Sequence, residues 1–155
     1  MGSRVRHRLH KLALLTIALT VQSNASEPPK ETTSIGGIRI GATKDELAHL
    51  GTPIVRRTGD AADPEWRFNN GLVVLFWAGE DEVVHIESRA HAVCTDTGVC
   101  PGMSAAHLNQ LLASDVMGHY PSDGEHEYPT TYDTCWLNVA VSDGVVRSIA
   151  LVCQP

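Results

Sequence analysis

Two stretches of the chain alternate between apolar and polar positions. GLVVLFWAGEDEVVHIES, residues 71–88, and CWLNVAVSDGVVRSIAL, residues 135–151, each combine an apolar segment, a polar turn and a second segment that begins with two valines. A period of two predicts half-buried strands, and the turn between them predicts a hairpin. Because the two stretches align at a shift of roughly 62 residues, they indicate a duplicated supersecondary unit.

A short helix is predicted ahead of each hairpin. IRIGATKDELAHLG, residues 38–51, aligns with GVCPGMSAAHLNQLL, residues 98–112, at a shift of 61 residues. The apolar positions that fall on one side of these helices are Leu47, Leu50 and Ile54 in the first copy and Leu108, Leu111 and Leu112 in the second. The fold class that follows is α+β, with two β-α-β-meander repeats whose short helices pack on one face of an antiparallel sheet.

The residues around the helix starts indicate scaffold rather than a phosphate site. Thr43 and Ser104 stand at the predicted N-caps, and Glu46 completes a capping box with Thr43. The glycines of GGIRIGATKDE do not have the spacing of a phosphate-binding loop. Gly41, like its counterpart Gly102, is therefore interpreted as giving backbone freedom to the corner before the helix.

Four cysteines in an exported chain imply disulfides. Pairing Ser142 with Val146 across the SDG turn sets positions 135 and 153 directly opposite each other. Directly opposed residues on antiparallel strands lie within disulfide range. The remaining two cysteines close the small loop CTDTGVC, and neither C-x₂-C spacing of a zinc site is present. The predicted disulfides are Cys135–Cys153 and Cys94–Cys100.

The same register divides the second hairpin into two faces. One face, which we expect to lie toward the helices, carries Cys135, Leu137, Val139, Ile149, Leu151 and Cys153. The other carries Trp136, Asn138, Ala140, Ser148, Ala150 and Val152, and a tryptophan among small residues is typical of a protein-binding patch. The alternative is that Trp136 is covered by the first repeat or by a loop, since large aromatic side chains are mostly buried.

For the first hairpin, residues 71–88, the sequence does not decide which side chains lie on which face. Trp77 can lie on either face, depending on whether the turn has two or three residues. If the open face follows the alternation Trp77, His85, Glu87, it extends the patch of Trp136 and Asn138.

The stretch HYPSDGEHEYPTTYD, residues 119–133, is predicted to be a polar loop because of its prolines and glycine. Its tyrosines suit protein contacts, because each offers apolar area and a hydrogen-bonding tip. They are Tyr120, Tyr128 and Tyr132. The alternative is a metal-binding protein or metal-dependent enzyme that uses the same loop, with the ligands His119, Asp123, His126 and Glu127.

The first residues have the pattern of a secretory signal peptide over residues 1–25. A basic stretch, the apolar run of residues 12–21 and a small-x-small site follow one another, and the run is too short to span a bilayer. Residues 26–34 are polar and carry two prolines, so they are predicted to be a disordered leader. The first repeat then covers residues 35–92 and the second covers residues 93–155.

The charge of the mature chain excludes some classes of partner. Of 12 Lys and Arg residues, four lie in residues 1–25, so eight remain against 18 Asp and Glu, a net charge of −10. Nucleic acids and anionic membranes require a basic surface, so neither is an expected partner. A basic protein partner is permitted.

Motifs for catalysis are absent from the sequence. There is no G-x-S-x-G nucleophile elbow, and no EF-hand pattern among the acidic turns. The predicted disulfides use all four cysteines, which leaves no thiol nucleophile. We therefore expect no enzyme activity and no cofactor.

The segments IGATKDELAHLGTP and EWRFNNGLVVLFWAGEDEVVHIE resemble the small envelope domains of the SmpA/OmlA (BamE) type. The residues that carry this resemblance are Gly41, Thr43, Leu50, Gly51, Pro53, Trp66 and Phe68. A tandem pair with internal disulfides is similar to the β-lactamase inhibitor protein architecture, in which two such units form one continuous sheet. The second copy lacks Leu-Gly-x-Pro after Leu111, and the chain lacks the lipid-bearing cysteine of BamE-type lipoproteins. The resemblance implies a fold and a binding role.

These observations together predict an exported module of the cell envelope that binds another protein. We expect it to be periplasmic or secreted, without a stable membrane anchor, and a monomer. It would inhibit its partner or assist envelope assembly, and the sequence leaves the identity of that partner open.

Overall fold

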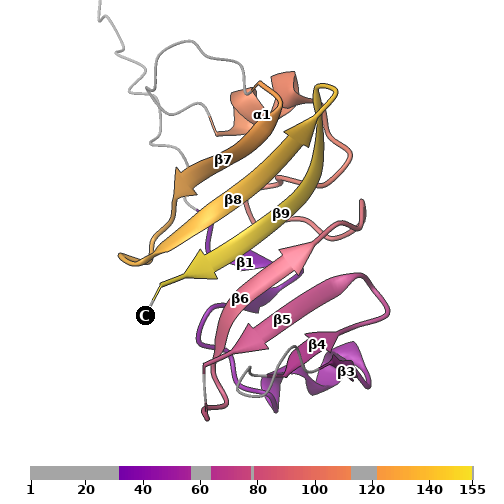
Figure 1. Cartoon of the computed structure of the whole chain (residues 1–155), viewed down its shortest axis with the longest axis vertical. Coiled ribbons are helices and arrows are strands. Elements are labelled where there is room, and N and C mark those ends of the chain that lie inside the picture. Colours follow the sequence, from indigo (N-terminus) through magenta and orange to yellow (C-terminus); the bar gives the residue numbers. More distant parts are fainter. Residues whose placement is uncertain (1–31, 57–63, 78, 113–121, 155) are drawn as a thin grey trace, which may run out of the picture.

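The computed structural model describes residues 32–56, 64–77, 79–112 and 122–154. Seven antiparallel strands form one sheet in the order β3-β4-β5-β6-β9-β8-β7 (Figure 1). Their bounds are β3 Ile54–Arg56, β4 Glu65–Arg67, β5 Leu72–Phe76, β6 Val83–Ser88, β7 Gly124–Pro129, β8 Cys135–Ser142 and β9 Val145–Cys153. The other elements are β1 Ser34–Ile35, β2 Ile38–Arg39, the 3₁₀ helix η1 Glu46–Leu50 and the α-helix α1 Ala105–Leu111. The α+β class is therefore confirmed.

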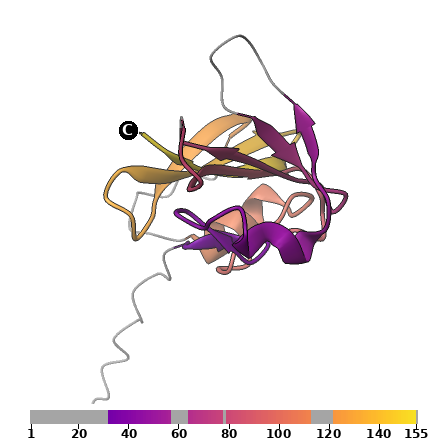
Figure 2. The same ribbon diagram turned by 90° about the horizontal axis from the view of Figure 1, so that it is seen from below.

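The helices and the small β1–β2 sheet lie on one side of the seven-stranded sheet (Figure 2). Between the two layers is the core, in which Leu47 of η1 and Leu108 of α1 are fully buried. The sheet contributes Leu72, Val74, Phe76, Ile86, Leu137, Val139, Ile149 and Leu151 to this core. Burial of each large apolar side chain stabilises the fold by about 1.5–3 kcal/mol, so this face of the sheet is fixed by packing.

The predicted faces of the second hairpin are confirmed. Every second residue of β8 is buried, beginning with Cys135. Both predicted disulfides, Cys94–Cys100 and Cys135–Cys153, are also present. Alternation in a local hairpin thus identified the core side of this part of the sheet correctly.

The predicted pairing at the turn was wrong by one residue. Ser142 pairs with Val145 instead of Val146, because Asp143 and Gly144 form a two-residue turn with φ values of 53° and 67°. Positive φ at both positions is the geometry of a tight hairpin turn. A bulge beside Ala140 then restores the register that brings the two cysteines together.

The two helix starts differ in their hydrogen bonds. Ser104 caps α1 as predicted, since its side chain accepts a hydrogen bond from the backbone N–H of His107 at 3.2 Å. At η1, the carboxylate of Glu46 accepts from the backbone N–H of Thr43 at 2.7 Å. The Thr43 hydroxyl donates to the same carboxylate instead of capping the helix, and the turn is 3₁₀ rather than α. Only the glutamate half of the predicted capping box is formed.

The predictions that Ile54 lies on the first helix and that residues 119–133 form a loop were wrong. Ile54 does not pack with Leu47 on a helix, but lies in the edge strand β3 with 59% of its surface exposed. Part of the predicted loop 119–133 forms strand β7, which pairs with β8 along its whole length. An edge strand tolerates Pro129 because only one of its sides is paired, so the turn-like composition concealed a strand.

The fold begins inside the stretch that was predicted to be a leader. Thr32 is 2% exposed and forms an isolated bridge with Thr130, and Ser34 belongs to β1. The backbone N–H of Thr33 donates to Asp96 at 3.0 Å, within the loop closed by the first disulfide. Residues 26–31 and the predicted signal peptide lie outside the described residues. No helix within the described ranges is long and apolar enough to cross a membrane.

Candidate functional site

The second face of the sheet, here called the open face, is the candidate site. Within the described part of the chain, no helix or further sheet packs against it (Figure 2). Because directly paired residues of antiparallel strands point to the same side, the strand register defines rows of side chains across this face. The central row contains Ile54, Arg67, Val73, Glu87, Ala150, Asn138 and Glu127, one residue from each strand.

A second row, here called the apolar row, runs beside the central row. It contains Leu75, His85, Val152, Trp136 and Pro129. On the other side of the central row lie Ser148, Ala140 and Glu125. Trp136 is half-buried, so part of this large ring is accessible on a face whose neighbours are mostly small. Trp136 and Asn138 lie on this face, as the alternation of the second hairpin predicts. The sequence left the face of His85 open, and the pairing of β6 with β9 places His85 and Glu87 on the face of Trp136.

An ion-pair group lies in the middle of the open face. The His85 Nε2 is 3.9 Å from the Glu87 carboxylate, and the Arg89 Nε donates to the same carboxylate at 2.9 Å. The close approach of His85, helped by the hydrogen bond and charge of Arg89, lowers the pKa of Glu87 to about 2, against the opposing effect of burial. Glu87 is therefore ionised and held in place at neutral pH.

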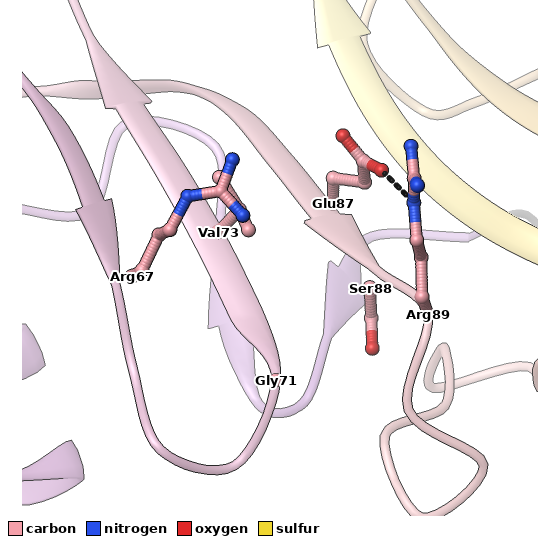
Figure 3. A pocket seen from close by; sticks show the side chains of 6 residues that line it. All are labelled: Arg67, Gly71, Val73, Glu87, Ser88 and Arg89. Carbon is pink, nitrogen blue, oxygen red and sulfur yellow. Dashed lines mark hydrogen bonds and ion pairs between the residues drawn. The ribbon is translucent and has the colours of Figure 1, made fainter. Parts of the chain in front are cut away.

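A hollow of about 230 Å³ lies beside this ion-pair group. Figure 3 shows the Arg67 guanidinium on one side of the hollow and the Glu87–Arg89 ion pair on the other. Its lining is Arg67, Gly71, Val73, Glu87, Ser88 and Arg89. Pockets for drug-sized ligands usually measure about 300–1,000 Å³, so this hollow suits a protruding side chain better than a small-molecule substrate.

Asn138 adds an unsatisfied acceptor to the open face. Its Oδ1 is buried and has no hydrogen-bond partner within the described residues. Its neighbours across the strands are Ala150 and Glu127, neither of which can donate a side-chain hydrogen bond at neutral pH. Buried polar atoms are usually paired, so the unpaired Oδ1 of Asn138 is an exception on this face.

The predicted tyrosines do not gather around Trp136. Tyr128 alternates to the helix side of β7, packs against the core, and has its pKa raised by burial. The Tyr132 hydroxyl donates to the backbone oxygen of Thr33 at 3.3 Å, far along the sequence. Tyr120 lies outside the described residues. Trp77 follows β5 directly, and its half-buried side chain belongs to neither row defined by the register.

The alternative metal ligands are also spread apart. His126 and Glu127 are successive residues of β7 and therefore point to opposite faces. Asp123 accepts a hydrogen bond from the backbone N–H of Gly144 at 3.2 Å, and that bond lowers its pKa. Within the described ranges no three His, Cys, Asp or Glu side chains are grouped to hold a metal ion, and His119 lies outside these ranges.

Sequence reasoning missed the part of the open face that β3, β4 and β5 contribute. A signal was present in EWRF, where Arg67 stands between two aromatic residues. Trp66 packs edge-on against Phe68 and Phe76, with ring centroids 6.3 and 5.0 Å apart. Alternation then places Arg67 on the opposite side, which is the open face.

Comparisons with protein-family models, curated proteins and solved structures return no match to this chain.

Proposed function

We propose that this chain is an exported protein-binding module of the cell envelope, and that the open face is its docking surface. It acts without catalysis, either by inhibiting its partner or by assisting envelope assembly. The observation that carries the proposal is the one-sided packing of the sheet, with both helices on one face and the apolar row with Trp136 on the other. Exposed apolar rows with a polar surround are typical of protein interfaces.

The chemistry of the open face supports a protein as the occupant. Tryptophan is among the residues that contribute most to binding energy at interfaces. Ala150 in the central row and Ala140 beyond it are small and allow the backbone of a partner to approach closely. The hollow next to Arg67 can receive a side chain of the partner.

The proposal extends to the architecture. We interpret the chain as two β-α-β-meander repeats, 35–92 and 93–155, similar to BamE-type domains and to the β-lactamase inhibitor protein. The sheet order supports this interpretation, because β4-β5-β6 and β7-β8-β9 occur in mirror order with β6 beside β9. Each set is preceded by one short helix, η1 or α1.

The location follows from the same proposal. Two disulfides are compatible with an exported protein, because reducing compartments do not maintain them. We propose a periplasmic or secreted site of action, with no cofactor. The proposal includes no metal site, because Asp123, His126 and Glu127 do not form a group of ligands among the described residues.

The test is affinity capture of envelope proteins with the mature chain, residues 26–155, followed by a binding titration with each captured protein. Trp136→Ala should weaken the titrated affinity at least tenfold, the effect of removing an interface residue that contributes about 1.4 kcal/mol. His107→Ala is the matched control, because His107 is exposed on α1 at the helix side. A partner whose affinity is unchanged by Trp136→Ala and by Arg67→Ala would contradict the assignment to the open face.

A further inference from the structure

The open face has charges at its two ends that are opposite in sign and an apolar row along its length. We propose that it pairs with the open face of a second copy of this chain and forms a weak symmetric dimer. This inference rests on the proposed protein-binding role of the face and names one occupant for it. It departs from the monomer expected from the sequence.

The symmetry of such a dimer follows from the strand order. Two sheets that meet face to face are related by a two-fold axis that lies midway between them. If the axis runs parallel to the strands and between β6 and β9, it keeps each row aligned and reverses the order of the strands. In that arrangement β4 lies over β7 of the second copy, and β5 lies over its β8.

The charges of the central row agree with this symmetry. Arg67 of β4 comes to lie over Glu127 of the second copy, and the two-fold axis generates the same pair again. The Arg67 side chain is 44% exposed and its Nε donates to Glu65, while its Nη groups have no hydrogen-bond partner among the described residues and are free for a second carboxylate. Glu127 is exposed, and no ion pair to it occurs among the described residues.

The apolar row is also complementary to itself. The same operation places Trp136 over Leu75 of the second copy and Val152 over its His85. Glu87, which already pairs with Arg89 and lies 3.9 Å from His85, comes to lie over the small Ala150 of the second copy. No two carboxylates and no two guanidinium groups of these rows face each other. Stacked sheets pack about 10 Å apart, and the small side chain of Ala150 opposite Glu87 is compatible with that spacing.

The size of the face predicts a weak dimer. In this arrangement six strands, from β4 to β7 in the sheet order, face those of the second copy. At about 4.8 Å for each strand they cover about 29 Å, and the three rows extend about 20 Å along the strands. The contact is then roughly 600 Å² on each copy, at the lower end of specific interfaces. We therefore expect monomer and dimer to be in exchange at micromolar to submillimolar concentrations.

Sedimentation equilibrium of the oxidised mature chain tests the proposal. Wild type should show a monomer–dimer equilibrium at concentrations up to about 1 mM, within the range of a weak interface. Arg67→Glu and Glu127→Arg should each weaken dimerisation at least tenfold, since each creates two like-charged pairs. The double variant Arg67→Glu, Glu127→Arg should return the dissociation constant to within about threefold of wild type.

The matched control combines Arg67→Glu with Glu125→Arg. Glu125 lies on the same strand and face, one row away, so this combination should not restore the dimer. Melting curves of all variants must show that they are folded. A protein that stays monomeric up to about 1 mM, or a swapped variant that fails to dimerise, would overturn the proposal.

These outcomes are separable from those of the capture experiment. If the charge swap fails while a captured envelope protein still depends on Trp136, the dimer is wrong and the proposed function stands. If the charge swap restores the dimer but no envelope protein binds, the dimer stands and the proposed binding of an envelope protein is wrong.

Discussion

The two halves of the sheet are held by different means. In the half formed by β3–β6, the outer strands β3 and β4 have three residues each, and the stabilising feature is the cluster of Trp66, Phe68 and Phe76. In the half formed by β7–β9, the strands have six to nine residues and a disulfide joins the ends of β8 and β9. Short strands therefore depend on aromatic packing, whereas the long hairpin depends on pairing and a covalent link.

The largest expected effect is in the aromatic half. Phe76→Ala removes a ring that is 3% exposed and packs on Trp66, so the free energy of unfolding should fall by about 3–5 kcal/mol. Leu75→Ala, on the open face of the same strand, is the matched control and should cost less. Urea denaturation of both variants checks this. If both variants lost the same free energy of unfolding, the aromatic cluster would not be what stabilises the β3–β6 half of the sheet.

The next effect separates the two disulfides. Replacing Cys135 and Cys153 with serine opens a loop of 18 residues and should cost about 3 kcal/mol. The same change at Cys94 and Cys100 opens a loop of six residues and should cost about 2 kcal/mol. Thermal melts with and without reductant give the comparison. Unchanged melting temperatures in reductant would contradict both values.

The two helix starts should differ by a smaller amount. Ser104→Ala removes a hydroxyl that accepts from the His107 N–H and should cost about 1 kcal/mol. Thr43→Ala should cost less, because the Thr43 hydroxyl donates to Glu46 and leaves the helix N–H groups without a side-chain cap. Paired urea titrations test the order of the two losses, and the reverse order would contradict the assignment of caps.

The smallest expected effect is the loss of stability at low pH that comes from Glu87. The pKa of Glu87 is about 2 in the fold against an ordinary value of 4.5, so its contribution to stability is complete above pH 4.5 and is lost as the pH falls toward 2. Because the group is partly exposed, we expect roughly 1 kcal/mol after solvent screening. Glu87→Gln should therefore lose less stability than wild type between pH 5 and pH 2. Parallel curves for the two proteins would contradict the role of the His85–Glu87–Arg89 group.

The sequence predicts local features of the fold better than distant ones. The faces of β8 and β9 follow from alternation within one hairpin, and the Cys135–Cys153 link follows from its register. The pairing of β6 with β9 joins residues roughly 60 positions apart, and no local pattern encodes it. Strand β7 was hidden because Gly124 and Pro129 favour turns, and tertiary pairing with β8 overrides that preference.

The candidate site was predictable to a similar extent. Trp136 and Asn138 were placed on one face, since alternation within β8 fixes their direction. The face of His85 was left open, because it depends on the pairing of β6 with β9. Arg67 was not found, because its position on that face depends on β4 joining the same sheet. The tyrosines were grouped by composition, but Tyr128 turns toward the core because it alternates with Glu127 along β7.

The position of β9 gives the protein an order of assembly. It is the last strand in the described sequence, yet it lies between β6 and β8 and is the only strand that bridges the two halves of the described sheet. Until residues 145–153 emerge from the ribosome or the export channel, one edge of β6 is unpaired and Cys135 of β8 cannot form its disulfide with Cys153. A chain stopped before Val145 would present two incomplete half-sheets, so a chaperone that shields strand edges has a defined interval in which to act.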